Sequence, residues 1–232
     1  MGKLVLVGSQ KCDLGKTIIC IKLGVALSEG GKRVLLLDLS NGKKKMSEYL
    51  NVNEDIIYDI KDVLDDTCSL DQAIIEINNN LSILPSPRIA GKLDSIKINT
   101  FTNLVNSSVN EYDFIIADVD KITLSYIDFK LVDEIITINN NDFSCIKEFN
   151  SEKTIAERNN VNITAMLNKY NLKHAKKGIM MNAKDIQKMT EMSMNLQIDD
   201  NSNYENVDYD FLVNKDENSF NKVIKAVGEK FI

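Results

Sequence analysis

An alternation of buried strands and helices along the chain constrains its fold more strongly than any other feature of the sequence. Residues 3–7 form a short apolar run, which is typical of a strand buried on both faces. Residues 16–28 carry apolar side chains at helical spacing, and the pair Gly30-Gly31 is typical of a helix C-terminus. A second apolar run follows at 33–39. A strand, a loop, a helix and a strand within about 40 residues predict two parallel strands joined by a right-handed crossover.

The same alternation continues to the end of the chain. Further strands are predicted at 81–84, 114–119, 134–138 and 163–167, and further helices at 60–64, 70–77, 100–108, 151–159, 183–194 and 219–231. No Gly/Ser-rich linker and no internal repeat divides the sequence. We therefore expect an α/β fold with a single doubly wound, mostly parallel sheet and helices on both faces, built as one domain over residues 1–232.

Composition narrows the classes of protein to which the chain can belong. Apolar residues make up 44% of the 232 residues, as in globular proteins, and the net charge of −6 does not attract nucleic acid or an acidic membrane. Cys12, Cys20, Cys68 and Cys145 lack metal-ligand spacing, and the single histidine, His174, is distant from them, so we expect no zinc site. The sequence shows no signal peptide and no apolar run long enough to span a bilayer. We expect a cytoplasmic protein with reduced thiols.

The loop after the first strand ends in Gly15-Lys16-Thr17, which is typical of a loop that holds phosphate groups. Backbone N–H groups at a helix N-terminus bind phosphate through their dipoles. The Lys16 side chain would reach the terminal phosphates, and the Thr17 hydroxyl would hold Mg²⁺. The predicted cofactor-binding residues of this loop are Cys12, Asp13, Leu14, Gly15, Lys16, Thr17 and Ile18.

Two acidic residues occur where predicted strands end. Asp38 lies at the end of the second strand and Asp118 near the end of the strand at 114–119. Ligands of an open parallel sheet bind beyond the carboxyl ends of its strands, and Mg²⁺ prefers carboxylate oxygens. Thr17, Asp38 and Asp118 therefore form a predicted Mg²⁺ site. The alternative interpretation is that both acids are ordinary strand-end residues and that Lys16 is a solvated lysine at a helix start.

These motifs resemble those of the MinD/ParA family of P-loop ATPases. The segment KCDLGKT, residues 11–17, resembles that family's deviant phosphate loop, K-G-G-x-G-K-T. Residues 33–40 are similar to its second strand and first switch, and residues 112–120 to its Walker B strand. The similarity is closest to the MinD branch, where it extends to residues 57–87 and 178–200, and it covers nearly the whole chain.

The resemblance implies a P-loop NTPase-like fold that binds ATP or ADP with Mg²⁺. It also implies an ATP-dependent homodimer, in which Lys11 reaches across to the partner's nucleotide, and it gives catalytic roles to Lys11, Lys16 and Asp38. Asn168, which follows the strand at 163–167, would read the adenine edge.

The sequence departs from the family pattern in the residues that surround these motifs. Gln10, Cys12 and Asp13 stand where the loop favours glycine. Two like charges about 5 Å apart at an effective dielectric near 20 repel by roughly 3 kcal/mol, so Asp13 opposes phosphate unless Mg²⁺ and the lysines offset it or it turns outward. The second acid of the first switch is replaced by Ser40. Residues 120–122 replace Pro-Ala-Gly after the Walker B strand.

Nucleotide binding is therefore favoured over fast hydrolysis. Residues 197–200 also lack the proline that flanks adenine in relatives. Cys12 is either a redox-sensitive thiol or simply a small loop residue.

The C-terminal helix carries its apolar residues on one face. These are Phe220, Val223, Ile224, Val227 and Phe231. We expect this face to pack on the sheet, and the alternative is a weak membrane contact.

Three hypotheses for function follow. The first is a MinD-like ATP-dependent dimerising switch, a weak ATPase with slow hydrolysis of ATP to ADP and phosphate, that positions a division site, a plasmid or a polar apparatus through an unidentified protein partner. Such a protein would be cytoplasmic, or peripheral to the membrane through that partner. The second is a non-hydrolysing nucleotide-binding scaffold. The third is a ParA-type DNA-partitioning ATPase, for which the basic cluster at 43–45 is the one candidate contact.

Overall fold

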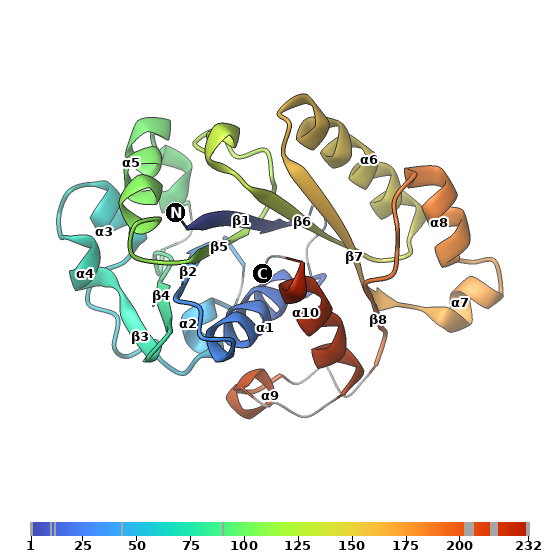
Figure 1. The fold of residues 1–232 in the computed structure, drawn as a ribbon, viewed down its shortest axis with the longest axis horizontal. Coiled ribbons are helices and arrows are strands. Elements are labelled where there is room, and N and C mark those ends of the chain that lie inside the picture. The colour runs from blue at the N-terminus through green and yellow to red at the C-terminus, as the bar shows by residue number, and fades with distance from the viewer. Residues whose placement is uncertain are drawn as a thin grey trace.

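The computed structural model describes residues 2–9, 11, 13–42, 44–89, 91–201, 207–213 and 218–230. These residues build one sheet of eight strands in the order β3-β4-β2-β5-β1-β6-β7-β8, with β3 and β8 at its two edges (Figure 1). All neighbouring strands are parallel except the β3–β4 pair. The strands are β1 (Lys3–Gly8), β2 (Val34–Leu39), β3 (Ile75–Asn78), β4 (Leu81–Leu84), β5 (Phe114–Val119), β6 (Glu134–Asn139), β7 (Asn162–Tyr170) and β8 (Gln197–Asp199).

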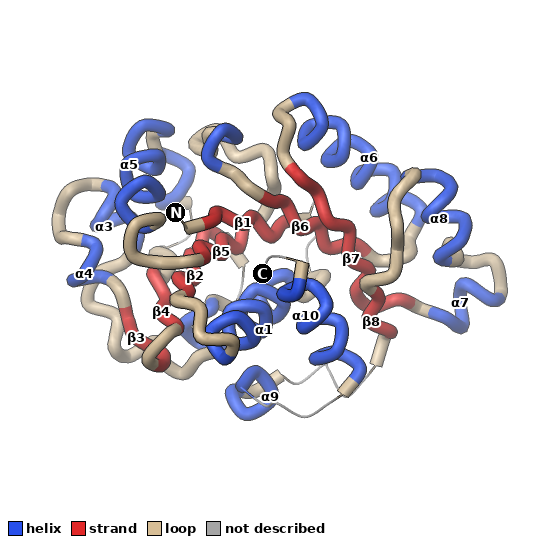
Figure 2. Tube along the Cα trace, in the orientation of Figure 1, coloured by secondary structure: helices blue, strands red, loops and turns tan. Residues whose placement is uncertain are grey.

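Helices cover both faces of the sheet (Figure 2). In the described residues they are α1 (Lys16–Glu29), α2 (Met46–Tyr49), α3 (Ile60–Leu64), α4 (Leu70–Ala73), α5 (Ile98–Ser108), α6 (Phe143–Arg158), α7 (Leu172–Lys176), α8 (Ala183–Thr190), α9 (Tyr209–Val213) and α10 (Ser219–Glu229). Two short 3₁₀ helices span Lys92–Ser95 and Phe129–Leu131. The predicted α/β fold, a mostly parallel sheet between helical layers, is thus confirmed.

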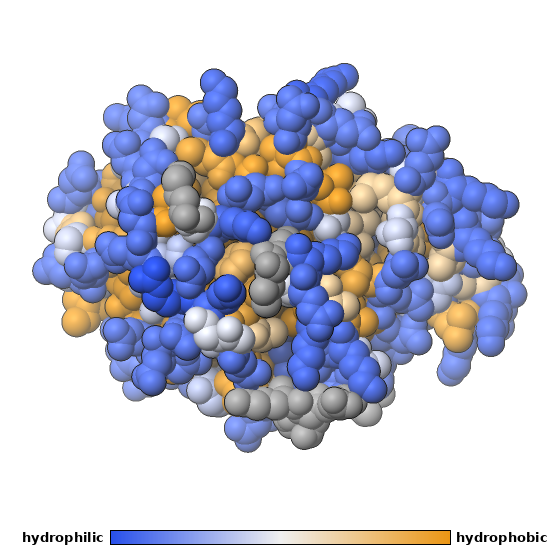
Figure 3. Space-filling view, in the orientation of Figure 1, coloured by the Kyte–Doolittle hydropathy of each residue, from blue (hydrophilic) through white to orange (hydrophobic). Residues whose placement is uncertain are grey.

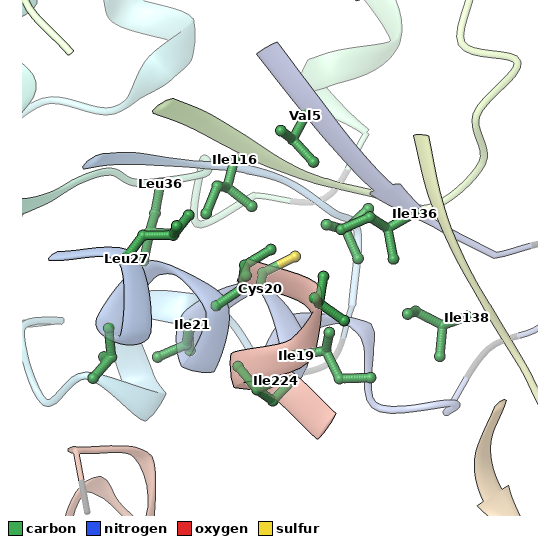
Figure 4. Packing of buried hydrophobic residues seen from close by; sticks show 14 of the residues in the cluster. Val5, Ile19, Cys20, Ile21, Leu27, Leu36, Ile116, Ile136, Ile138 and Ile224 are labelled. Carbon is green, nitrogen blue, oxygen red and sulfur yellow. The ribbon is translucent and has the colours of Figure 1, made fainter. Parts of the chain in front are cut away.

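Apolar side chains of the central strand β1 contribute to the core on both faces of the sheet, because successive strand residues point to opposite faces. Val5 and Val7 pack in the cluster that contains α1, whereas Leu4 and Leu6 pack in the cluster that contains α5. Figure 4 shows the first cluster, in which Val5 lies above the α1 side chains. A third cluster joins α6 and α8 to β7.

Helix α1 lies unusually close to the sheet at Gly24. A Cβ atom at this position would lie 2.8 Å from Leu36 Cδ2 and 3.1 Å from Leu81 Cδ1. The absence of a side chain therefore permits the approach, which sets the distance between α1 and the strands that carry the site.

The C-terminal helix α10 buries the predicted apolar face. Phe220, Ile224 and Val227 are buried, and Val223 is half-buried against the same cluster. The face is covered chiefly by α1, which lies beside α10 (Figure 1), and a side chain at Gly228 would meet Leu23 and Leu27 of α1. The face thus packs against a helix that itself covers the sheet. Phe231 lies outside the described residues.

The helix predicted over 70–77 is wrong in its second half. Helix α4 ends at Ala73, and Ile75–Asn78 forms β3, which pairs antiparallel with β4. Side chains of β3 alternate between half-buried and exposed, because the strand pairs at the sheet edge. The two-residue turn after Asn78 makes this hairpin, and tertiary pairing overrides the helical pattern.

Other element boundaries shift more modestly. Helix α6 begins at Phe143, well before the predicted 151, because the Asp142 side chain caps it by accepting a hydrogen bond from Ser144 N. The helix predicted at 183–194 ends at Thr190. Helices α2, α7 and α9 were not predicted.

The face in Figure 3 is largely hydrophilic, with apolar residues showing between the polar side chains. No helix within the described ranges combines the length and the apolar character needed to cross a bilayer.

Candidate functional site

The loop that joins β1 to α1 lies at the carboxyl edge of the sheet. Gly15, directly before α1, has a left-handed backbone with φ of 76°. Asp13 has a φ of 59°, a conformation that Asp tolerates better than most residues. Gln10 and Cys12 lie outside the described residues, so the predicted contact of Cys12 has no structural description. The loop therefore turns sharply into α1 despite the loss of its glycines.

The N-terminus of α1 directs toward this loop the backbone N–H groups that have no partner within the helix. The first N–H groups of any helix have no partner within the helix, and the N-cap Gly15 has no side chain to cap them. The first turn contains no acidic residue. This arrangement fits an anion, because the donors and the helix dipole point toward the same place.

Thr17, in the first turn of α1, is bonded to the carboxylate at the end of β5. Its hydroxyl donates a hydrogen bond of 2.5 Å to Oδ2 of Asp118. Asp118 is fully buried, and its other oxygen, Oδ1, has no hydrogen-bond partner among the described residues. Burial, and then the nearby charge of Asp38, raise the pKa of Asp118 to about 7, although the Thr17 hydrogen bond and the Lys16 charge act in the opposite direction. An orphaned, buried carboxylate oxygen beside a hydroxyl is a fitting ligand set for a hard cation.

Asp38 is held differently from Asp118, although the two residues are register partners on neighbouring strands. Its Oδ1 accepts hydrogen bonds from Ser40 N (3.1 Å) and Ser40 Oγ (2.8 Å). Its Oδ2 accepts from Met46 N (3.0 Å) and Ser86 Oγ (3.1 Å). Asp38 is fully buried and links the segment after β2 to the residues after β4.

The two lysines of the loop point in different directions. Lys16 Nζ lies 3.4 Å from the backbone oxygen of Lys11 and so folds back over the loop. Lys11 Nζ lies 3.3 Å from Oδ2 of Asp142, the N-cap of α6. Hydrogen bonds from Ser144, and then the Lys11 ammonium, hold the pKa of Asp142 below its ordinary value. The structure thus brings Lys16, Thr17 and Asp118 together, and it places the Lys11 ammonium at the start of α6.

Two adjoining cavities open along this edge of the sheet. The first, which we call the loop cavity, has a volume of about 570 Å³ and is lined by Lys16, Thr17, Asn41, Tyr49 and Asp120 among others. The second, the β7 cavity, has a volume of about 300 Å³ and is lined by Asn168, Lys169, Asp199 and Phe220 among others. Asp13, Gly15, Ile18 and Tyr49 line both cavities. We call the two cavities together the hollow. Its loop end has the Lys16 ammonium and the N-terminus of α1, and its β7 end has the Asn168 amide together with the charged side chains of Lys169 and Asp199.

The end of β7 is fastened to the phosphate loop. The buried Asn168 donates a hydrogen bond from Nδ2 to the backbone oxygen of Leu14 at 2.8 Å. Lys169 donates from Nζ to the backbone oxygen of Asp13 at 2.8 Å. The Asn168 amide therefore supports the loop as well as lining the β7 cavity.

Tyr49, Asp120 and Lys169 line these cavities and were missed by the sequence analysis. The Lys44 ammonium lies over the ring of Tyr49, with Nζ 3.8 Å from the ring centroid. Burial, followed by the charges of Glu48, Asp118 and Asp13, raises the pKa of the Tyr49 hydroxyl. A tyrosine in a short helix gives no sequence signal, whereas Lys169 adjoins the predicted Asn168 and Asp120 stands at a position that departs from the family pattern.

Comparisons with known proteins agree with this geometry. Residues 5–230 match the family described as the CobQ/CobB/MinD/ParA nucleotide binding domain. The chain belongs to this family. The predicted membership of the MinD/ParA family is therefore confirmed.

Individual members of the MinD/ParA family share part of the sequence and all of the fold. The chain is 33% identical over 120 residues to the septum site-determining protein MinD of Synechocystis, a match covering 51% of this chain and 45% of that protein. It therefore spans less than half the length of that relative. The MinC:MinD cell division protein complex of Aquifex aeolicus matches with a TM-score of 0.83 and 21% identity over 99% of this chain and 95% of that chain. MinD of Pyrococcus horikoshii OT3 complexed with Mg-ADP matches with a TM-score of 0.79 and 21% identity over 99% of this chain and 96% of that chain.

The donor set suits Mg²⁺ better than a transition metal. No cluster of three or more histidine, cysteine or carboxylate residues that would hold a metal occurs in the part of the chain that the structure describes. Mg²⁺ needs no such cluster, because it keeps several waters and takes one or two carboxylates together with substrate phosphates. Thr17 and the Asp118 oxygen that has no partner within the described ranges supply such a partial shell.

Proposed function

We propose that this chain binds ATP or ADP with Mg²⁺ in the two joined cavities and works as a MinD-like, nucleotide-dependent switch. The observation that carries the proposal is the Thr17–Asp118 pair. It places a buried carboxylate oxygen, which has no hydrogen-bond partner among the described residues, beside the first turn of α1, whose N-terminus has no side-chain cap. A divalent cation bound to phosphates would satisfy that oxygen.

Each part of the hollow has a role in this proposal. The N–H groups of α1 and the Lys16 ammonium bind the β- and γ-phosphates, while Thr17 and Asp118 hold the metal. Asp38 holds the segment after β2 in place, and a direct role in the metal shell requires one of its four hydrogen bonds to break. Asn168, in the β7 cavity, faces the base. Mg²⁺ contributes charge neutralisation of the phosphates when it is bound.

Dimerisation on ATP is the second part of the proposal. Lys11 and Asp142 are partly exposed, with side-chain accessibilities of 30% and 44%. An exposed ion pair contributes about 0–1 kcal/mol, so the approach of a second copy can draw Lys11 from Asp142 to the partner's phosphates at little cost. In a single copy Asp142 engages the Lys11 ammonium, so Lys11 is the cation that we assign to the partner's site.

The output of the switch is recruitment of a protein partner that positions a division site, a plasmid or a polar apparatus. The Aquifex relative was solved as a MinC:MinD complex, which supports a protein partner for this chain too. If the chain associates with a membrane, it does so peripherally, by binding that partner. The one continuous sheet supports a single working domain.

A nucleotide-binding scaffold without hydrolysis is the second candidate function. Asp13 favours it, because this carboxylate lines both cavities and stands where phosphate binds. The exposed position of Asp13 weakens the repulsion but does not remove it. The DNA-partitioning hypothesis receives less support, because Lys45 bonds to the backbone of Ser40 and Lys44 lies over Tyr49, and Lys43 is outside the described residues.

Calorimetry separates these alternatives from a failure of the whole proposal. ATP and ADP with Mg²⁺ should bind the wild-type chain, and Lys16→Ala should weaken ATP binding more than ADP binding. Single-turnover hydrolysis at excess protein then distinguishes the ATPase switch from the scaffold. A folded wild-type chain that takes up neither nucleotide contradicts both candidates.

A further inference from the structure

Asp120 lines the loop cavity, and the proposed nucleotide site gives it no role. It follows β5, two residues after Asp118, and it is half-buried. Its Oδ2 accepts a hydrogen bond of 2.8 Å from the backbone N–H of Asn41, in the segment after β2. The carboxylate is therefore fixed in direction and bridges the two segments that close the phosphate end of the cavity.

The other carboxylates near the phosphates are unsuited to contact a water molecule at the γ-phosphate. Asp118 is buried beneath Thr17. Both oxygens of Asp38 are occupied by hydrogen bonds from Ser40, Met46 and Ser86.

Asp13 and Asp120 are the described acids that line the loop cavity. Asp13 is exposed and also lines the β7 cavity, and the Lys169 ammonium bonds to its backbone rather than to its carboxylate. That bond leaves the Asp13 side chain undirected. Asp120 is thus the acid with a fixed orientation at the phosphate end.

Asp120 also lies near Asp118 in the chain and shares the loop cavity with the phosphate loop. It stands two residues after Asp118, directly after the end of β5. Asp120 and the next residue, Lys121, both line the loop cavity. The Asp120 carboxylate lies on the side of that cavity where the segment after β2 contacts it.

We propose that Asp120 orients the water that attacks the γ-phosphate of bound ATP, an inference that rests on the proposed nucleotide site. Oδ2 stays on Asn41 N, and Oδ1 accepts a hydrogen bond from the water. The water oxygen forms a bond to the γ-phosphorus while the bond from that phosphorus to the β–γ bridging oxygen breaks, and ADP leaves with the electron pair. One water proton remains on inorganic phosphate and the other passes to solvent.

This assignment makes hydrolysis depend on the segment after β2. The Asn41 N–H holds the carboxylate in its direction, and Asn41 Oδ1 in turn lies 3.5 Å from Gly91 N. Movement of that segment turns the carboxylate away from the water. A positioned group of this kind is typically worth 10²–10⁴-fold in rate.

The test compares Asp120→Ala and Asp120→Glu with the wild-type chain in single-turnover hydrolysis of Mg-ATP at excess protein. Asp71→Asn, which removes an exposed carboxylate on α4 far from the cavity, is the matched control. Calorimetry with a non-hydrolysable ATP analogue and a thermal melt accompany each variant. We expect Asp120→Ala to slow the single-turnover rate on the order of 10²-fold, with analogue affinity unchanged or higher. Asp120→Glu should keep part of the rate, and Asp71→Asn should keep all of it.

Each other outcome overturns the assignment in a recognisable way. If Asp120→Ala binds the analogue more tightly and hydrolyses ATP at the wild-type rate, Asp120 only repels phosphate. If the wild-type chain binds the analogue but never hydrolyses ATP, Asp120 orients no water and the scaffold function remains. If the wild-type chain binds no nucleotide, the proposed function itself fails.

Discussion

Asp38 and Asp118 lie side by side on β2 and β5, and both are fully buried, yet their carboxylates have opposite surroundings. Asp38 accepts four hydrogen bonds, whereas Asp118 accepts one from Thr17 and has one oxygen with no partner among the described residues. Two adjacent buried acids repel unless a cation lies between them or one is neutral. The folded chain is therefore prepared for a positive ligand at Asp118.

The free energy of unfolding should depend on pH because of the buried Asp118 carboxyl. The pKa of Asp118 is raised from its ordinary value of 3.8 to about 7, chiefly by burial and then by Asp38. A carboxyl whose pKa is higher in the folded state stabilises the fold fully below the unfolded pKa, and that contribution is lost as pH rises toward about 7. The metal-free chain should thus lose stability between roughly pH 4 and pH 7, as measured by urea unfolding.

Asp118→Asn provides the matched variant, because it keeps the shape of the side chain and removes the charge. Without metal, this variant should lose less stability than the wild-type chain over the same pH range. With ADP present, Mg²⁺ should raise the melting temperature of the wild-type chain but not that of the variant. Parallel pH curves for the two proteins would count against the raised pKa.

Tyr49 should contribute to nucleotide affinity, because its side chain lines both cavities. We expect Tyr49→Ala to weaken ADP binding by about tenfold, which corresponds to ~1.4 kcal/mol and lies at the upper end of the range for a specific aromatic contact. Tyr49→Phe keeps the ring and should bind nearly as the wild-type chain does. Calorimetric titration measures both, and equal affinities for the alanine variant and the wild type would remove Tyr49 from the site.

Asn168 should support the loop even in the absence of nucleotide. Asn168→Ala removes the hydrogen bond to Leu14 O and leaves that carbonyl without its partner, which should destabilise the chain by about 1–3 kcal/mol. Lys169→Ala removes an exposed side chain that bonds to Asp13 O and should cost less. Urea unfolding of the two variants without nucleotide gives the comparison, and a larger loss for Lys169→Ala would reverse our ranking.

The Lys11–Asp142 pair should be weak, and helix capping should dominate the role of Asp142. Asp142→Asn breaks the ion pair but keeps a good N-cap for α6, so it should change stability by about 0–1 kcal/mol. Asp142→Ala also removes the cap on Ser144 N and should cost about 1 kcal/mol more. Unfolding curves at low and high salt separate the two terms, since screening weakens only the ion pair. A salt-independent loss in Asp142→Asn would contradict this division.

Much of the fold and part of the candidate site could be predicted from the sequence because local patterns determine them. Apolar runs gave the central strands, and the position of Thr17 and Asp118 after neighbouring strands predicted that they meet, as they do. The β3 strand was missed because Ile74 and Ile77 have helical spacing whereas Ile75 and Ile77 have strand spacing, and only the pairing with β4 decides between the two.

The surroundings of Asp38 lay beyond prediction for a different reason. Its donors come from Ser40, Met46 and Ser86, which are brought together only by the folding of three segments. The sharing of Tyr49 by two cavities likewise depends on how α2 packs. Spacing along the chain predicts which strand ends meet, but it does not predict which loop groups fold over them.

The full complement of donors on Asp38 has a consequence for how the chain responds to any ligand at that point. A carboxylate has room for about four donors, two on each oxygen, and Asp38 already holds that number. An incoming ion or water cannot simply be added there and must take the place of Ser40, Met46 or Ser86. A ligand that binds the Asp38 carboxylate would therefore release the chain segment that carries the displaced donor. Ligand binding and movement of that segment would then occur together.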